Sequence, residues 1–243
     1  MKKTLFAALL GGFCAGPALA MHPLISEDTG FLGKGGRQVE AGFEYSQASE
    51  GGNSYGRSLA AEFSYGLTDK ADLLFTVPWQ GWTAAGASES GLGDLALDVK
   101  FQAAGWVFAV KPGFTLASGD DEKGLGAGKS AFGASLVAGK TVGAWQYYFN
   151  AGYLLNKNKG GEKEDILKAS AAAAYEVLPK TLLTADLSAE TNADPAAASH
   201  PLSSVFGVVW SPRDTLDLDA GVKLGLNDAA DDLGLLVGAT FRF

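Results

Sequence analysis

The sequence predicts an all-β fold, a 12-stranded antiparallel transmembrane β-barrel whose strands follow one another around the wall as an up-and-down meander. Three observations lead to this prediction: an export signal, segments of about ten residues with alternating apolar and polar side chains, and connections between them that alternate between short and long. After the export signal, no segment approaches the 18 consecutive apolar residues of a transmembrane helix. Because only helices and closed barrels satisfy every backbone polar group in lipid, such a chain can cross a membrane only as a barrel.

The first twenty residues have the features of a secretory signal peptide. Lys2 and Lys3 precede a short apolar stretch, and Ala18-Leu19-Ala20 forms a small-residue cleavage site. The apolar stretch is shorter than the roughly 20 residues that a membrane anchor needs. We therefore predict a signal peptide at 1–20, an N-terminal periplasmic segment at 21–37 and an outer-membrane barrel at 38–243. Removal of the signal peptide also removes Cys14, the only cysteine, so the mature chain can form no disulfide.

Twelve segments alternate with the period of two that is typical of strands. In one of them Leu95, Leu97 and Val99 fall on one face while Asp94 and Asp98 fall on the other. An even number of strands is what single-chain bacterial barrels have. The predicted strands are 38–46, 57–66, 72–79, 94–102, 106–117, 130–140, 145–156, 166–177, 182–191, 204–211, 216–225 and 233–243.

Connection lengths separate this barrel from a soluble β-sandwich, whose strands also alternate. Every second connection is short, namely 67–71, 103–105, 141–144, 178–180 and 212–214. Most of the others are long and polar, namely 80–92, 118–129, 157–165 and 192–203. Short periplasmic turns and longer extracellular loops are the asymmetry of an outer-membrane barrel, so both ends of the barrel are expected on the periplasmic side.

Aromatic side chains support the same orientation, because they gather where a membrane meets water. Trp106 and Trp145 follow predicted periplasmic turns, Trp210 precedes one, and Trp79 marks the opposite rim. Further aromatic residues at the periplasmic level are Tyr65, Phe101, Phe241 and Phe243.

The charge of the mature chain excludes nucleic acid as a partner. It keeps all 27 acidic residues but loses Lys2 and Lys3 from the 19 basic ones, which leaves a formal charge of −10. On the predicted lumen face, acids outnumber bases. The acids are Glu40, Glu44, Glu62, Asp72, Asp94, Asp98, Glu176, Asp186, Glu190, Asp217 and Asp219, and the bases are Lys100, Lys111, Lys168, Lys223 and Arg242.

Two interpretations of this lumen stay open. Carboxylates that line a hydrated passage would favour cations. Alternatively, the acids and bases form cross-strand ion pairs that fill the space and hold the wall. Barrels of about eight strands are filled by side chains and those of about sixteen leave a channel, so twelve strands are compatible with both.

The sequence offers little support for an enzyme, a cofactor or a metal. His200 lies near Ser199 and Asp194 in a long loop, where a solvated histidine is the simpler reading, and no catalytic residues are predicted. Asp120, Asp121 and Glu122 cluster in another loop, but their spacing is not that of an EF-hand. We predict no metal site and no cofactor.

The segment at 21–37 precedes the first strand and has no sustained strand or helix period. Leu24, Ile25, Phe31 and Leu32 make it too apolar for an ordinary solvated tail. Extended, it could reach up to roughly 55 Å from the periplasmic mouth. We therefore weigh two possibilities: a plug inside the barrel, with Lys34 and Arg37 available to the acidic wall, or a loose periplasmic leader.

Three stretches resemble the outer-membrane transporter family named for the MetA pathway of phenol degradation. They are HPLISEDTGFLGKGGRQVE from His22, SGLGDLALDVKFQ from Ser90 and KPGFTLASGDDEKGLGAGKSAFG from Lys111. The resemblance implies a passive transporter in the bacterial outer membrane, with small organic solutes, including aromatic ones, as cargo. The final Phe241 and Phe243 also resemble the C-terminal signal read by the barrel-assembly machinery.

The sequence therefore predicts a porin-like channel for small solutes. Its expected partners are outer-membrane lipid and lipopolysaccharide, the barrel-assembly machinery and the solute, and its expected state is a monomer. The alternative is a non-conducting structural or adhesion barrel, which differs in having a closed lumen.

Overall fold

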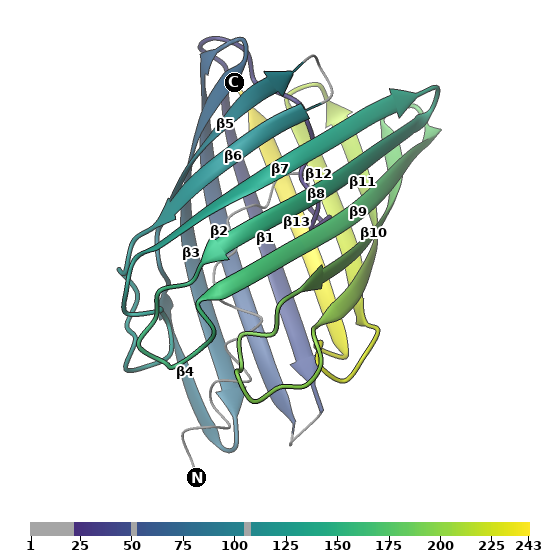
Figure 1. Cartoon of the computed structure of the whole chain (residues 1–243). Coiled ribbons are helices and arrows are strands. Elements are labelled where there is room, and N and C mark those ends of the chain that lie inside the picture. Colours follow the sequence, from purple (N-terminus) through teal and green to yellow (C-terminus); the bar gives the residue numbers. More distant parts are fainter. Residues whose placement is uncertain (1–21, 50–52, 105–107) are drawn as a thin grey trace.

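The computed structural model describes residues 22–49, 53–104 and 108–243 and arranges them as a single tilted barrel (Figure 1). The predicted signal peptide and Trp106 lie outside the described residues. The strands are β1 (Arg37–Ala48), β2 (Ser54–Thr68), β3 (Ala71–Ala84), β4 (Ala87–Leu92), β5 (Ala96–Ala104), β6 (Phe108–Thr115), β7 (Ala131–Val142), β8 (Trp145–Leu155), β9 (Asp165–Leu178), β10 (Thr181–Glu190), β11 (Leu202–Arg213), β12 (Leu216–Gly225) and β13 (Leu233–Arg242). Among these residues, no helix is long and apolar enough to span a membrane.

The wall is closed by pairing between the first and last strands. β1 pairs with β13 from Gln38↔Arg242 to Gln47↔Leu233 and with β2 on its other edge. β4 and β5 both pair with β3, at its two ends, and together occupy one position in the wall. The wall therefore has twelve antiparallel positions, which confirms the predicted 12-stranded meander.

The segment 80–92 differs from the prediction of a long loop, which was wrong. β3 continues to Ala84 and β4 returns from Ala87, so the two strands form a hairpin. The turn residues Ala85 and Gly86 have φ of 50° and 81°, the backbone of a two-residue type I′ turn. The hairpin has no apolar and polar alternation because its strand residues are largely Ala, Ser and Gly, and so the period of two could not reveal it.

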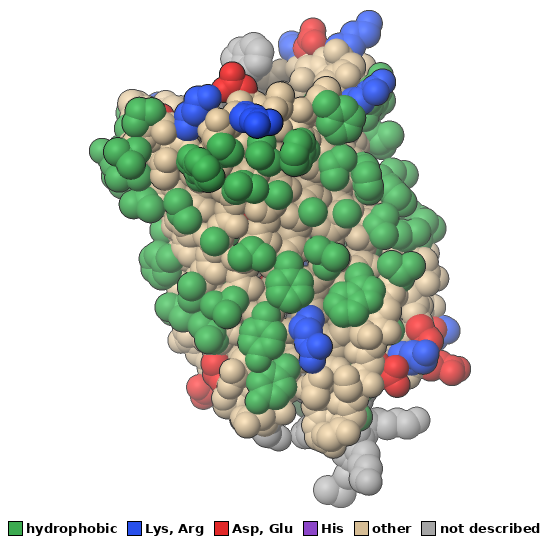
Figure 2. Space-filling view, turned by 180° about the vertical axis from the view of Figure 1, so that it is seen from behind, with side chains coloured by type: hydrophobic (Ala, Val, Ile, Leu, Met, Phe, Trp, Pro, Cys, Tyr) green, Lys and Arg blue, Asp and Glu red, His purple; other side chains and the backbone are tan. Residues whose placement is uncertain are grey.

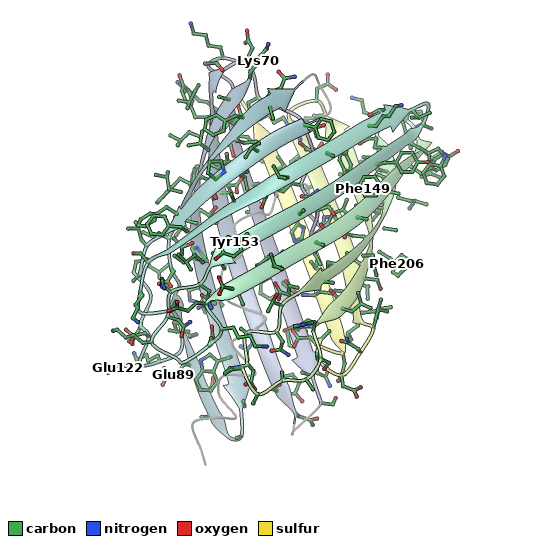
Figure 3. All side chains as sticks on the ribbon, in the orientation of Figure 1. Lys70, Glu89, Glu122, Phe149, Tyr153 and Phe206 are labelled. Carbon is green, nitrogen blue, oxygen red and sulfur yellow. The ribbon has the colours of Figure 1, made fainter. Side chains whose placement is uncertain are left out.

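The outward side chains form an apolar surface between two charged ends (Figure 2). Leu136, Phe149 and Phe206 are each more than half exposed, and Phe206 points away from the wall in Figure 3. Near the periplasmic end, Trp145 stacks on Tyr147 and packs against Tyr175, with ring centroids 6.0 and 4.7 Å apart. Such a band and girdle fit lipid, and this is the wall of a bacterial outer-membrane protein.

The inner face has the opposite character, because charged side chains are buried there. Glu62, Asp98 and Lys111 are each no more than 2% exposed. They lie on β2, β5 and β6, next in the sequence to outward-facing apolar residues. The barrel is thus apolar outside and polar inside, as a membrane-spanning barrel requires.

An arginine on the outer face tests this orientation. Leu97 lies between the outward rings of Phe75 and Phe114 on neighbouring strands. We expect Leu97→Arg to lower the free energy of unfolding in lipid by about 2–4 kcal/mol, because the charge would lie in hydrocarbon. The measurement is urea unfolding in vesicles.

The matched control is Ser188→Arg, on the inner face of β10, where a cavity leaves room for the side chain. Its unfolding free energy should stay closer to that of the unmodified protein. Equal losses in both variants would contradict the assignment of the two faces.

Candidate functional site: the barrel lumen

Residues 22–36 are called here the N-terminal segment. Most of the segment lies inside the barrel rather than in its wall, and its end at Lys34 and Gly35 is exposed. At the periplasmic end the segment joins the β2 end, where Gly35 N–H donates to Gly66 O at 2.8 Å and Gly66 N–H donates to Gly36 O at 2.9 Å. From there it runs inward, and Leu24 and Ser26 are almost completely buried. Figure 1 shows its purple trace within the barrel.

Glycines in the wall make room for the tip of the segment. A Cβ atom at Gly207 or Gly221 would come within 2.4 or 2.8 Å of the Pro23 ring. Leu24 packs beside Tyr148 and Ala172 in a small buried cluster. The close approach of Pro23 to β11 and β12 therefore depends on residues without side chains.

Wall side chains accept hydrogen bonds from the backbone N–H groups of the segment. Asp186 Oδ2 accepts from Ile25 N at 2.9 Å and from Ser26 N at 2.6 Å. Asn150 both accepts from Glu27 N at 2.9 Å and donates to Glu27 O at 3.1 Å. These side-chain bonds replace a strand ladder, because an irregular buried backbone still needs partners.

Ion pairs join acids of the segment to bases of the wall. Lys111 pairs with Glu27 in an almost fully buried contact, and Lys100 Nζ lies 3.1 Å from Asp28 Oδ1. His22 Nδ1 contacts Asp219 on β12. The expected roles are thus reversed: the segment contributes its carboxylates, whereas Lys34 and Arg37, which were expected to serve the acidic wall, are both exposed.

The structure places most of the predicted lumen residues inside the barrel. Fully buried are Glu40, Glu62, Asp72, Asp94, Asp98, Lys100, Lys111, Asp186 and Asp219. Partly buried are Glu44, Lys168, Glu190, Asp217, Lys223 and Arg242. Glu176 does not line the enclosed lumen, because the last residues of β9 are exposed beside the turn to β10, where its carboxylate accepts from Lys180 N at 3.4 Å.

Three wall bases pair with wall acids, two of them on a neighbouring strand and the third, Lys223 of β12, with Glu44 of β1 across the intervening β13. The distances are 3.3 Å for Lys168–Glu190, 3.0 Å for Lys223–Glu44 and 2.5 Å for Arg242–Asp217. The other two predicted bases, Lys100 and Lys111, reach the N-terminal segment instead. An ion-pair network is therefore present, and it includes the segment as well as the wall.

Asp94 holds an extracellular loop, a role that its sequence position did not reveal. Its two oxygens accept from Gly119 N and Ala127 N, each at 2.8 Å. Gln80 on β3 donates to Leu125 O at 2.7 Å, and Leu125 is 2% exposed. The loop 116–130 thus folds against the inner face of β3. In the sequence, only a leucine among the glycines of this loop indicated that part of it would be buried.

The loop residues considered for metal binding or catalysis have structural partners. Asp120 accepts from Glu122 N and Lys123 N of its own turn, and Asp121 pairs with Lys159 at 3.0 Å. His200 Nδ1 accepts from Asn192 N at 3.0 Å. In the described ranges, no three His, Cys, Asp or Glu side chains are grouped so that they could hold a metal ion.

Above the N-terminal segment lies a cavity of about 880 Å³, called here the outer cavity. Its floor is the tip of the segment, formed by Pro23, Leu24, Ile25 and Glu27. Every strand except β4 contributes to its walls, and the connections around 192–201 and 228–231 lie at its rim. The outer cavity therefore opens at the end with the long connections, which is the extracellular end.

Comparison with known protein families shows to which family this chain belongs. The family described as "Putative MetA-pathway of phenol degradation" matches residues 22–243, which include the N-terminal segment and the whole barrel. The chain belongs to this family. No curated protein is similar enough in sequence to match it.

Solved structures share its fold at low sequence identity. A COG4313 outer membrane channel from Pseudomonas putida F1 is 15% identical, with a TM-score of 0.72 over 89% of this chain and 98% of that chain. The KdgM porin is 11% identical, with a TM-score of 0.55 over 85% and 99%. The β domain of the Bordetella autotransporter BrkA is 11% identical, with a TM-score of 0.56 over 86% and 100%. Channels and an autotransporter domain share the barrel fold of this protein. The fold alone therefore does not give the function, which has to be argued from the lumen.

The attachment of the segment predicts the effect of removing one wall base. Lys111→Met leaves Glu27 buried without its cation, which typically costs about 3–5 kcal/mol. We expect faster amide hydrogen exchange at residues 24–32 and unchanged exchange in the β1–β13 ladder.

Lys223→Met is the control, since its Glu44 pair joins two wall strands and does not involve the segment. It should leave exchange at residues 24–32 unchanged. Equal exchange at these residues in Lys111→Met and the unmodified protein would show that the pair does not hold the segment.

Proposed function

We propose that this protein is a passive outer-membrane channel for small organic solutes, which enter the outer cavity and leave past the N-terminal segment into the periplasm. One observation carries the proposal: an open cavity inside a closed barrel ends on a floor that belongs to no strand ladder. Side-chain bonds and ion pairs hold this floor, so it can move without opening the wall.

The dimensions of the outer cavity support a small solute. Its volume of about 880 Å³ falls in the roughly 300–1,000 Å³ range of small-molecule sites. The floor offers the apolar side chains of Pro23, Leu24 and Ile25, which suits the organic and aromatic compounds suggested by the family description.

The charges around the outer cavity favour cationic or neutral solutes over anions. Its acidic lining residues are Glu27, Glu44, Asp98, Glu190, Asp194, Asp228 and Asp231, and its basic ones are Lys111, Lys168 and Lys223. A passage with an excess of carboxylates raises the local concentration of cations. We therefore propose a cation-preferring conductance.

The C-terminal residues support assembly through the usual bacterial route. Phe241 and Phe243 are outward and more than half exposed, and Phe243 N donates to Arg37 O at 3.0 Å. We propose that the barrel-assembly machinery reads these rings, that the mature protein is a monomer, and that its surroundings are outer-membrane lipid and lipopolysaccharide.

A non-conducting structural barrel is the second candidate. The observation that favours it is the burial of the segment tip, where Leu24, Ser26 and Glu27 are at most 3% exposed. If this floor never moves, the lumen stays closed and the protein serves only as a wall or an adhesion surface.

Deleting residues 25–33 separates the two candidates. The deletion removes the contacts with Asp186, Asn150 and Lys111 but keeps the Gly35 and Gly36 bonds to Gly66. We expect the single-channel conductance in planar bilayers to rise by roughly twofold or more, because residues that narrow an intermediate-sized barrel are gone. Cation preference should persist.

Folding is checked separately by the heat-dependent mobility of the barrel on a gel. A folded deletion protein whose conductance equals that of the unmodified protein would remove the segment from any gating role. Silence of both proteins at all voltages would favour the structural barrel.

A further inference from the structure

We propose that the floor of the outer cavity is a binding site for the primary ammonium group of a small organic cation with an apolar body. Asp98 of β5 and Glu27 of the N-terminal segment would be its acceptors. This site rests on the proposed function in one respect: the bound cation is taken to be the cargo of the channel.

Asp98 is the observation from which the site is built. Its side chain lines the outer cavity and is 1% exposed, yet neither carboxylate oxygen has a hydrogen-bond partner among the described residues. Most buried polar groups in proteins do have such partners. A buried carboxylate without them is unfavourable, and a cation that donates hydrogen bonds would offset that cost.

Glu27 provides a further acceptor at the same place. Its Oε1 contacts Lys111 Nζ, whereas its Oε2 has no hydrogen-bond partner within the described ranges. Glu27 also lines the outer cavity. Three carboxylate oxygens therefore lack donors, and a primary ammonium group carries three N–H donors.

The local charge also leaves room for a cation. Lys111, Glu27 and Glu62 are all close enough to Asp98 to interact with it electrostatically. The oxygens of Glu62 accept from Ser64 at 3.2 Å and Thr76 at 3.4 Å, so neutral hydroxyls are its hydrogen-bond donors. Three acids thus surround one lysine, and one more positive charge reduces the excess.

The neighbouring surface specifies the rest of the ligand. Leu24, Ile25 and Leu154 line the same cavity, and Ile25 keeps 37% of its surface exposed. Gly113 also lines it, and a Cβ there would lie 1.9 Å from Asp98 Oδ1, so only glycine lets the carboxylate occupy this position. A metal ion would need more oxygen ligands, and no suitable group of three acids or histidines occurs in the described part of the chain.

The test measures binding of 2-phenylethylamine to the full chain in detergent by titration calorimetry. Its comparison compounds are 2-phenylethanol and phenylacetate, which keep the apolar body but replace the ammonium by a neutral or anionic group. We expect the amine to bind at least about tenfold more tightly than the alcohol, since hydrogen bonds to charged groups are the stronger ones. Phenylacetate should not bind.

Two variants assign the binding to this floor. Asp98→Asn should weaken amine binding about tenfold or more while alcohol binding is unchanged. Asp231→Asn removes the same charge at the rim of the cavity and should change binding less than about twofold. If Asp98→Asn does not fold, Glu27→Gln replaces it, because Glu27 lies outside the wall, and the same loss is expected.

The outcomes that overturn the proposal are specific. Equal binding of amine and alcohol would mean an apolar site only, and equal losses in Asp98→Asn and Asp231→Asn would mean diffuse attraction without a site. Calorimetry needs no membrane, so a protein that binds the amine but never conducts contradicts the proposed channel alone. A protein that conducts but does not bind the amine contradicts this site alone.

Discussion

The closure of the hydrogen-bond ladder between β1 and β13 is the constraint on which the rest of the structure depends. In lipid an unpaired strand edge has no water to satisfy it, so the wall must return to its own beginning. Closure fixes which residues face hydrocarbon and which face inward. Because the outer positions must be apolar, nearly all the charge that the barrel strands carry is directed into the lumen or to the ends.

A polar interior changes what can be buried there. In a soluble protein an irregular strand-free segment would lack partners in the core, but here wall side chains provide them. Asp186 and Asn150 bind the segment's backbone, while Lys100 and Lys111 bind its carboxylates. The lumen is therefore both filled and charged. The two interpretations of its charges overlap: the ion pairs Lys168–Glu190 and Lys223–Glu44 line the outer cavity, and the cation preference proposed there rests on the acids in excess of these pairs.

The fold was predictable from sequence because period-two alternation is a local signal. The alternation was missing in the β3–β4 hairpin, where most residues are small, and there the prediction of a loop was wrong. The face of each charged residue was predictable for the same reason, except for Glu176 at the end of β9. Partners were not predictable, since they depend on where distant elements meet. Lys34 and Arg37 were natural candidates to meet an acidic wall, but the glycines at 33–36 form the bend at the periplasmic end and leave both outside. Asp94 was assigned to the lumen, but its role in holding a loop was not predicted. Its partners there, Gly119 and Ala127, contribute only backbone N–H groups, which are the same in every residue except proline.

Glu27 connects the floor of the cavity with its proposed ligand. The same carboxylate that ties the N-terminal segment to Lys111 would accept hydrogen bonds from a cation bound beside Asp98. Such a cation would use Glu27 Oε2 and leave the contact of Oε1 with Lys111 in place, so it would bridge the segment to Asp98 of β5 and hold the segment more tightly when the site is occupied. Linkage between two equilibria is reciprocal, so a displaced segment would in turn change the affinity of the site for the cation. Because this bridge would be made by side chains of Asp98 and Glu27 and not by backbone groups, the ladder that closes the barrel is not part of this coupling.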